Sequence, residues 1–318
     1  MIDFRYHLVS LVAVFMALAV GIALGAGPLK DPVDAALGNQ TEELRKEKEE
    51  LRVQVRELES RLAFDEELTA ISAPSVVTGS LAGRSVLLVS LPGADEEEVG
   101  LLRAAAELAG ATVSGTVAVQ DSYLEPDQAG VLGDLVARLG GAGGGEGSPY
   151  EKAAAALAAA LVVDQEEAAG QATPSAQALL AALVEIGFLK VDGAPEQRAT
   201  LVLTVAGPTP DSADAAEAQS AALLPLVAAL DDAGSGEVLG GPVGSAGEGS
   251  LIAGVRDTPD LRAAVSTDDV ADTASGRTVA VLALVDQSRD VTGHFGIGPG
   301  GESPAALAGA IRTPASAP

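Results

Sequence analysis

The sequence predicts an α/β protein: an N-terminal transmembrane helix and a short parallel coiled coil, followed by a three-layer α/β domain with a mainly parallel sheet. Three observations predict this arrangement. Residues 8–27 carry no charged side chain, leucines recur every seven residues from Leu44 to Leu58, and residues 84–119 read as strand, helix and strand. An apolar run of about 20 residues spans a bilayer core. A strand–helix–strand unit is typical of a parallel sheet.

The 318-residue chain is long enough for one sizeable core beyond the anchor and the rod. We expect six segments: a cytoplasmic leader 1–7, a transmembrane signal anchor 8–27, a linker 28–40, a coiled coil 41–72, an extracytoplasmic α/β domain 78–300 and a flexible tail 301–318.

Composition excludes several classes of function. Acidic residues outnumber basic residues 45 to 19, which gives a formal net charge of −26. Phosphate backbones and anionic lipid surfaces repel such a chain, so we expect no nucleic-acid partner and no peripheral docking on headgroups. The chain has no cysteine, which excludes disulfides, thiolate metal sites and cysteine nucleophiles.

The apolar run at 8–27 has two interpretations, an uncleaved signal anchor or a cleaved secretory signal. Its length exceeds the apolar part of a secretory signal, which favours the anchor, but the small residues around Ala23 and Gly25 leave cleavage open. Gly21 and Gly25 form a GxxxG spacing that allows close helix contact, although a simple lipid-facing helix is the alternative. A short leader before a large acidic domain favours placing the domain outside the cytoplasm.

The next helix is expected to begin near Asn39 and Glu42, which resemble a capping box, and to end at Ser72-Ala73-Pro74. Its predicted coiled-coil seam consists of Leu44, Lys48, Leu51, Val55, Leu58 and Leu62. Leucine at one seam position with a β-branched residue at the other favours a parallel homodimer.

The flanking charges agree with this register, which places Arg61 opposite Glu66 of a second copy. A single amphipathic helix packed on its own domain is the alternative, because Lys48 in the seam weakens the coil. In either case the rod is short.

The α/β domain is predicted from alternating apolar strands and helices. The expected strands are 85–91, 112–119, 200–205 and 278–284, with weaker candidates near Val238 and at 251–255. The expected helices are 95–108, 128–139, 150–163, 175–187 and 214–231, with a flexible glycine loop at 140–147 and a disordered end at 313–318.

A search for catalytic motifs finds no P-loop, no Gly-x-Ser-x-Gly elbow and no His-Glu-x-x-His helix. His7 and His294 are predicted on opposite sides of the bilayer, so they cannot share a metal. We interpret residues 296–300 as a structural loop and Asp268-Asp269 as helix capping. The sequence therefore predicts no catalytic, cofactor or metal site, and a protein that is not an enzyme.

The N-terminal sequence MIDFRYHLVSLVAVF (1–15), continuing to GAGPL (25–29), resembles the mycobacterial copper transport protein B (MctB) family of actinobacterial envelope proteins. The later segments GRSVLLV (83–89), VAVLAL (279–284) and GHFG (293–296) are similar to the family in the same order. The resemblance implies copper efflux, described as an outer-membrane channel. Its SteB-like branch implies a different role: pairing with a membrane partner and helping to control peptidoglycan hydrolysis at the division site.

The residues support some of these implications better than others. A lipid-facing β-barrel needs many alternating strands and aromatic girdles, whereas this chain is helix-rich with 3% aromatic residues. Copper prefers sulfur or imidazole ligands, and the chain offers only Met1, Met16, His7 and His294.

We therefore expect a dimeric, non-enzymatic binding or scaffold module of this family, with a SteB-like regulator as the alternative. The expected partners are the bilayer and a second copy, with a second envelope membrane protein as a further candidate. A copper ion is implied only by the resemblance.

Overall fold

A computed structural model of the chain describes residues 4–25, 30–139, 147–165, 169–170, 172–193, 197–307 and 309. The chain divides into two compact units, Met1–Asp65 and Glu66–Pro318. Parts of five predicted segments lie outside the described residues: 1–3 of the leader, 26–27 of the anchor, 28–29 of the linker, 140–146 of the glycine loop, and 308 and 310–318 of the tail.

The first unit contains helix α1 (Phe4–Gly25) and the start of helix α2 (Lys30–Val77). Within α1, Arg5–Gly25 is long and apolar enough to cross a membrane. This helix agrees with the predicted membrane span over the residues that the structure describes.

Helix α2 is longer than the sequence predicts at both ends. It begins at Lys30 rather than near Asn39, and it continues through Pro74 to Val77. The prediction that proline would end the helix is therefore wrong. Because Pro74 lies within the last turn, it removes one backbone donor close to a point where the helix stops anyway. The buried side chain of Val77, in the second unit, secures this last turn in the core.

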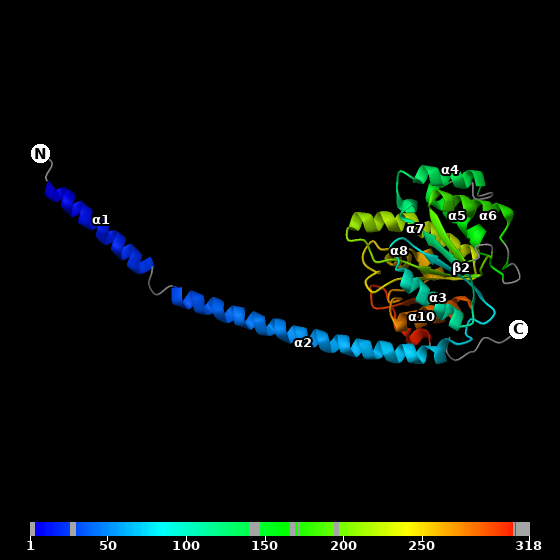
Figure 1. The fold of residues 1–318 in the computed structure, drawn as a ribbon, viewed down its shortest axis with the longest axis horizontal. Helices are drawn as coiled ribbons and strands as arrows, with labels where there is room; N and C mark the ends of the chain where they lie inside the picture. The colour runs from blue at the N-terminus through cyan, green and yellow to red at the C-terminus, as the bar shows by residue number, and fades with distance from the viewer. Residues whose placement is uncertain are drawn as a thin grey trace. The chain divides into compact units, whose positions relative to one another are not determined.

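The second unit is built on a seven-stranded sheet of order β3-β2-β1-β4-β5-β6-β7 (Figure 1). Its strands are β1 (Ser85–Ser90), β2 (Thr112–Val119), β3 (Leu189–Gly193), β4 (Leu201–Val205), β5 (Glu237–Gly240), β6 (Ser266–Asp268) and β7 (His294–Phe295). All neighbouring strands are parallel except the pair β2 and β3. The predicted fold class, a three-layer α/β domain with a mainly parallel sheet, is confirmed.

Helices cover both faces of the sheet (Figure 1). One face packs against α4 (Ala129–Leu139), α5 (Pro149–Leu161), α6 (Pro174–Ile186), α7 (Ala213–Ala233), α8 (Leu251–Asp257) and α9 (Pro259–Ala264). The other face packs against α3 (Glu96–Leu108), α10 (Ala274–Gln287), the end of α2 and the 3-10 helix η4 (Pro304–Leu307). A further 3-10 helix, η1 (Asp121–Leu124), follows β2.

Local sequence signals set several boundaries correctly. Helix α3 begins where the Asp95 carboxylate accepts hydrogen bonds from the N–H groups of Glu97 and Glu98. It ends before Gly110, whose φ of +88° is a backbone conformation that favours glycine. Strands β1, β2 and β4 and the weaker candidate near Val238, which lies in β5, are confirmed.

Two predicted strands are helices. Residues 278–284 lie in α10, and residues 251–255 form most of α8. Every residue from Val279 to Val285 is buried, so α10 is apolar on all sides and lacks the periodicity that distinguishes a helix from a buried strand.

Two other predictions in this part of the chain also fail. Asp268 and Asp269 do not cap a helix: Asp268 ends β6, and the cap of α10 is Thr273. Residues 301–307 are not a free tail, because Glu302 pairs with Phe295 and Leu307 is buried in the core.

Candidate functional site

The strand order reverses direction between β1 and β4, so the loops after these two strands diverge. In open parallel sheets, ligands bind at the carboxyl ends of the strands at such a switch point. This edge of the sheet is therefore the first place to look for a site.

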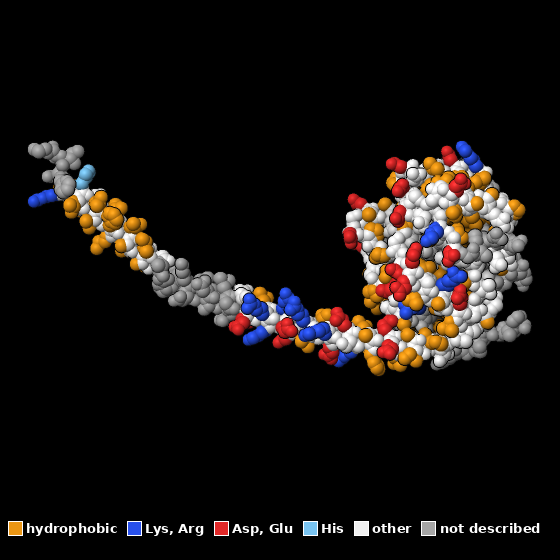
Figure 2. Space-filling model, viewed as in Figure 1, with side chains coloured by type: hydrophobic (Ala, Val, Ile, Leu, Met, Phe, Trp, Pro, Cys, Tyr) orange, Lys and Arg blue, Asp and Glu red, His pale blue; other side chains and the backbone are white. Residues whose placement is uncertain are grey.

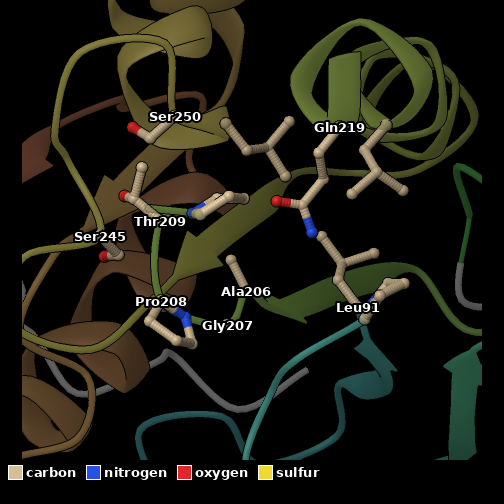
Figure 3. A pocket seen from close by; sticks show the side chains of 12 residues that line it. Leu91, Ala206, Gly207, Pro208, Thr209, Gln219, Ser245 and Ser250 are labelled. Atoms are coloured by element: carbon tan, nitrogen blue, oxygen red, sulfur yellow. The ribbon is translucent and has the colours of Figure 1, made fainter. Parts of the chain in front are cut away.

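The crevice at the switch point is closed in this protein. Figure 3 shows the side chains that line the small cavity left there. The loop after β1 and the loop after β4 meet backbone to backbone, since a Cβ on Gly207 would lie only 2.6 Å from the Gly93 carbonyl oxygen. What remains is a cavity with about 20 Å³ of room for water, bordered by Leu91, Ala206 and Gln219. Such a volume holds about one water molecule, so a nucleotide cannot bind here.

An open acidic groove of about 630 Å³ is lined in part by Gly93 and Pro208 of the same two loops. Its four carboxylates are Asp95, Glu97, Glu98 and Asp272. Burial, followed by the charges of Asp272 and Asp95, raises the pKa of Glu98, while Arg277 lowers it. Asp95 already caps α3 and Asp272 accepts the N–H of Val243, so two of the four carboxylates have structural roles.

A buried ion pair lies at the carboxyl ends of β6 and β7. The Arg256 Nη1 atom lies 2.8 Å from Asp269 Oδ2, and both side chains are at most 3% exposed. Arg256 also donates to Thr267 Oγ1 and to the carbonyl oxygens of Phe295 and Pro299. This network anchors the glycine loop after β7.

The same loop binds to the other oxygen of the aspartate. The N–H groups of Ile297 and Gly298 both donate to Asp269 Oδ1. A Cβ at Gly298 would meet the Ala246 side chain at 2.8 Å, so glycine is needed for the loop to close. The prediction of a structural loop at 296–300 agrees with this geometry.

Two further carboxyl groups are buried without a charged partner. Burial raises the pKa of Asp268 to about 8, and its Oδ2 atom has no hydrogen-bond partner among the described residues. Burial also raises the pKa of Glu237 well above its usual range, although Thr204 donates to its Oε1 atom. Burial therefore favours the protonated, uncharged form of both carboxyl groups.

The predicted coiled-coil residues lie on the surface of the first unit. Leu44, Leu51, Val55, Leu58 and Leu62 are each at least half exposed, and Lys48 is exposed beside them. Figure 2 shows apolar side chains among Lys, Arg, Asp and Glu along this helix. The observed ion pairs are within the helix: Arg61 binds Glu57 at 2.6 Å. Gly21 and Gly25 have open space at their Cβ positions.

A family profile described as "Copper transport outer membrane protein, MctB" matches residues 1–306. The chain belongs to this family. The MctB match includes α1, α2 and nearly all of the described α/β domain. The resemblance read from the N-terminal sequence is thereby confirmed.

Curated relatives agree with the MctB assignment. Proteins named "Copper transporter MctB" from Mycobacterium tuberculosis and Mycobacterium bovis are 30% identical over 320 residues, covering 95% of this chain and 98% of theirs. The protein of that name from Mycobacterium leprae is 30% identical over 329 residues with the same coverage.

For a member of the MctB family, the described residues offer few copper ligands. No group of three or more His, Cys, Asp or Glu side chains in the described part of the chain could hold a metal ion. The prediction that His294 lies in a loop is wrong. This residue lies in β7, and its side chain is buried. Its Nδ1 atom lies 3.0 Å from Thr267 Oγ1 and its Nε2 atom 2.9 Å from the Arg262 carbonyl oxygen. Both ring nitrogens therefore have partners, and burial lowers the pKa of the imidazole.

Sequence reasoning missed the buried network, although two signals of it were visible. An adjacent pair of aspartates and a run of glycines at 296–300 are both present. Neither indicates that a single arginine, Arg256, would join them.

Proposed function

We propose that the protein serves copper transport in the cell envelope as a membrane-anchored homodimer. In this proposal α1 holds the chain in the bilayer, α2 pairs with α2 of a second copy in a parallel coiled coil, and the α/β domain lies outside the cytoplasm. The domain acts as a non-enzymatic binding or scaffold module, and copper is the cargo of the system rather than a cofactor of this chain. The match to the MctB family over residues 1–306 carries the copper part of the proposal.

The apolar stripe on α2 supports the homodimer. Leu51 is 53% exposed and Leu58 is 57% exposed, at positions seven residues apart. Leucines spaced in this way gain hydrophobic stabilisation when a partner helix covers them. One contact within the chain competes with a predicted interchain pair. Glu66 Oε2 accepts a hydrogen bond from Ala274 N, so this oxygen is already used within the chain.

The molecular mass of the full-length protein in detergent tests the homodimer. We expect a dimer for the wild type and a monomer for Leu51→Asp, because a carboxylate in the seam has no partner. Val53→Asp is the matched control, since Val53 is 51% exposed on the same helix but lies outside the seam. The homodimer is wrong if Leu51→Asp leaves the mass unchanged or if Val53→Asp dissociates the protein equally.

The absence of cysteine from the chain allows a clean test of orientation. Ala137→Cys places one thiol at an exposed position of α4. We expect a membrane-impermeant maleimide to label this variant in intact cells. Labelling that occurs only after the membrane is broken would place the domain in the cytoplasm.

The role of copper is tested by metal retention and by transport. We expect purified protein exposed to Cu(I) or Cu(II) and then dialysed to retain less than one copper per chain, since soft ligands are few. Stoichiometric retention would contradict the scaffold role. Copper-dependent conductance of the protein reconstituted alone in membranes would also contradict it and would support a channel.

A SteB-like regulator of peptidoglycan hydrolysis is the second candidate, and the scarcity of copper ligands favours it. In that case a deletion strain has a cell-separation defect with normal copper sensitivity, and the full-length protein co-purifies with a septal membrane protein. Copper sensitivity with normal separation supports copper transport instead.

A further inference from the structure

A second groove, of about 480 Å³, lies between α3 and the part of the sheet formed by β2 and β3. It is separate from the switch point and from the acidic groove. Thr116 pairs in register with Leu88, whose side chain belongs to the core under α3, so Thr116 and Ser90 point to the same face. Lys190 and Asp192 of β3 pair with Ala118 and Thr116, which places both charged residues on this face. Figure 2 shows cationic and anionic side chains intermingled where α3 and β2 lie in Figure 1.

Two ion pairs cross this groove from α3 to β3. Lys190 Nζ lies 3.5 Å from Glu96 Oε1, and Arg103 Nη1 lies 3.7 Å from Asp192 Oδ2. A strong charge-assisted hydrogen bond is shorter, at about 2.7–2.9 Å. Glu96 is 93% exposed and Asp192 is 82% exposed, so these pairs contribute little to stability. The charges are held near one another without strong bonds between them, which leaves them available to a ligand.

Polar side chains also line the groove. Ser90 of β1 and Thr116 of β2 each contribute a hydroxyl group to its lining. Arg103 is only one-third exposed, and its Nε atom donates to Glu107 at 3.1 Å. That bond orients the guanidinium, so one cation is fixed in place before any ligand arrives. A concave site with a few converging polar groups is the usual form of a small-molecule site.

The charge balance selects the class of ligand. The groove has two cations and two carboxylates, whereas the chain as a whole carries a net charge of −26. The overall field opposes a ligand with net negative charge, and the groove itself has no net charge with which to hold a ligand of one sign. No aromatic ring lines the groove, so it offers no stacking surface for a base or another flat ring. A ligand with one charge of each sign meets an opposite charge at each end of the groove.

We infer that this groove binds a short peptide with free termini. Its carboxylate is held by Arg103 at one end of the groove, and its ammonium by Glu96 at the other end, two helical turns away on α3. The Ser90 and Thr116 hydroxyls then face the peptide backbone. The inference does not depend on the homodimer or on copper, because every residue involved lies in the α/β domain of one chain.

Calorimetric titration of the full-length protein in detergent with dialanine tests the inference. We expect saturable binding of dialanine, and binding weaker by about tenfold or more for N-acetyl-dialanine and for dialanine amide, which each lack one charge. Saturation by all three peptides with equal affinity, or by none of them, overturns the inference.

Variants show whether binding occurs in this groove. Arg103→Gln and Glu96→Gln are expected to weaken dialanine binding about tenfold or more, since each removes the charge that holds one terminus of the peptide. Arg138→Gln is the control, because Arg138 is exposed on α4 across the sheet. Unchanged binding in both groove variants, with thermal unfolding like the wild type, would overturn the assignment. An equal loss in the control would overturn it as well.

Discussion

Glu66 and Ala274 lie 208 residues apart in the sequence, yet Glu66 Oε2 accepts a hydrogen bond of 2.7 Å from the Ala274 backbone N–H. Ala274 is the first residue of α10, and Thr273 caps the same end through the N–H of Gly276. A carboxylate at this position satisfies a backbone donor that has no partner within the helix, and it interacts favourably with the helix dipole. The last part of α2 is therefore bonded to the domain as well as packed against it.

Removing this carboxylate is expected to destabilise the domain. Glu66→Ala should lower its free energy of unfolding by about 0.5–1 kcal/mol, the usual contribution of a charge at a helix N-terminus. Urea unfolding followed by tyrosine fluorescence measures the change, because Tyr123 is buried in the domain and the chain has no tryptophan. The exposed neighbour provides the control, since Glu67→Ala should change the unfolding free energy much less. Equal effects of the two substitutions would contradict the capping role.

Breaking the buried ion pair should cost much more. Asp269→Asn leaves the Arg256 guanidinium buried beside a neutral partner, and we expect a loss of about 3–5 kcal/mol in the free energy of unfolding. Lys190→Gln breaks an exposed pair and should cost at most about 1 kcal/mol. Chemical denaturation of both variants measures the difference. A small effect of Asp269→Asn would show that the glycine loop does not depend on this pair.

The pKa of about 8 at Asp268 predicts a pH dependence of stability. The folded protein holds this proton more tightly than the unfolded chain, where the pKa is near 3.8, so stability decreases as pH rises from about 4 to about 8. Asp268→Asn removes this contribution, and the variant should gain stability relative to the wild type as pH rises to 8. Burial also raises the pKa of Asp231, to about 6, and that of Glu237. Both carboxyl groups remain in the variant and cancel from the comparison. Parallel stability curves for wild type and variant would show that Asp268 is ionised in the folded state.

Two glycines should respond in opposite ways to alanine. Gly207→Ala introduces a Cβ onto the backbone of Gly93, and overpacking of this kind costs about 1–3 kcal/mol. Gly100→Ala adds a methyl group in open space on α3, and it should stabilise the protein by about 0.5–1 kcal/mol because alanine favours a helix interior. Thermal unfolding of both variants gives the signs. Tolerance of Gly207→Ala would mean that the loops after β1 and β4 can separate and that the crevice can open.

The sequence predicts the parts of the fold whose signals are local. Strands such as 85–91 are continuous apolar runs next to turn residues, and Asp95 indicates the start of α3 directly. Elements that depend on tertiary context are not predictable in this way. Strand β6 has the sequence Ser-Thr-Asp, so it lacks the apolar residues from which a buried strand is predicted. Its polar side chains are buried, and they form hydrogen bonds with Arg256, Gln287 and a backbone amide.

The candidate site was less predictable than the fold. The groove beside α3 combines residues from β1, α3, β2 and β3, and β3 itself was not predicted. Its antiparallel pairing with β2 brings Lys190 and Asp192 beside α3. Nothing in the local sequence around Lys190 indicates that pairing, since it is set by the register of two strands about seventy residues apart.

The passage of α2 through Pro74 determines where the chain can be cut. The turn that follows α2 makes residue 78 look like a natural boundary. A truncated protein that starts there would lose Val77 from the core, and it would lose the Glu66 carboxylate that accepts the Ala274 N–H at the start of α10. Secretion or crystallisation of an anchor-free fragment therefore requires a start no later than Glu66. Shorter fragments would remove the end of α2 from beside the half-buried Ala105 and expose more apolar surface, which favours aggregation.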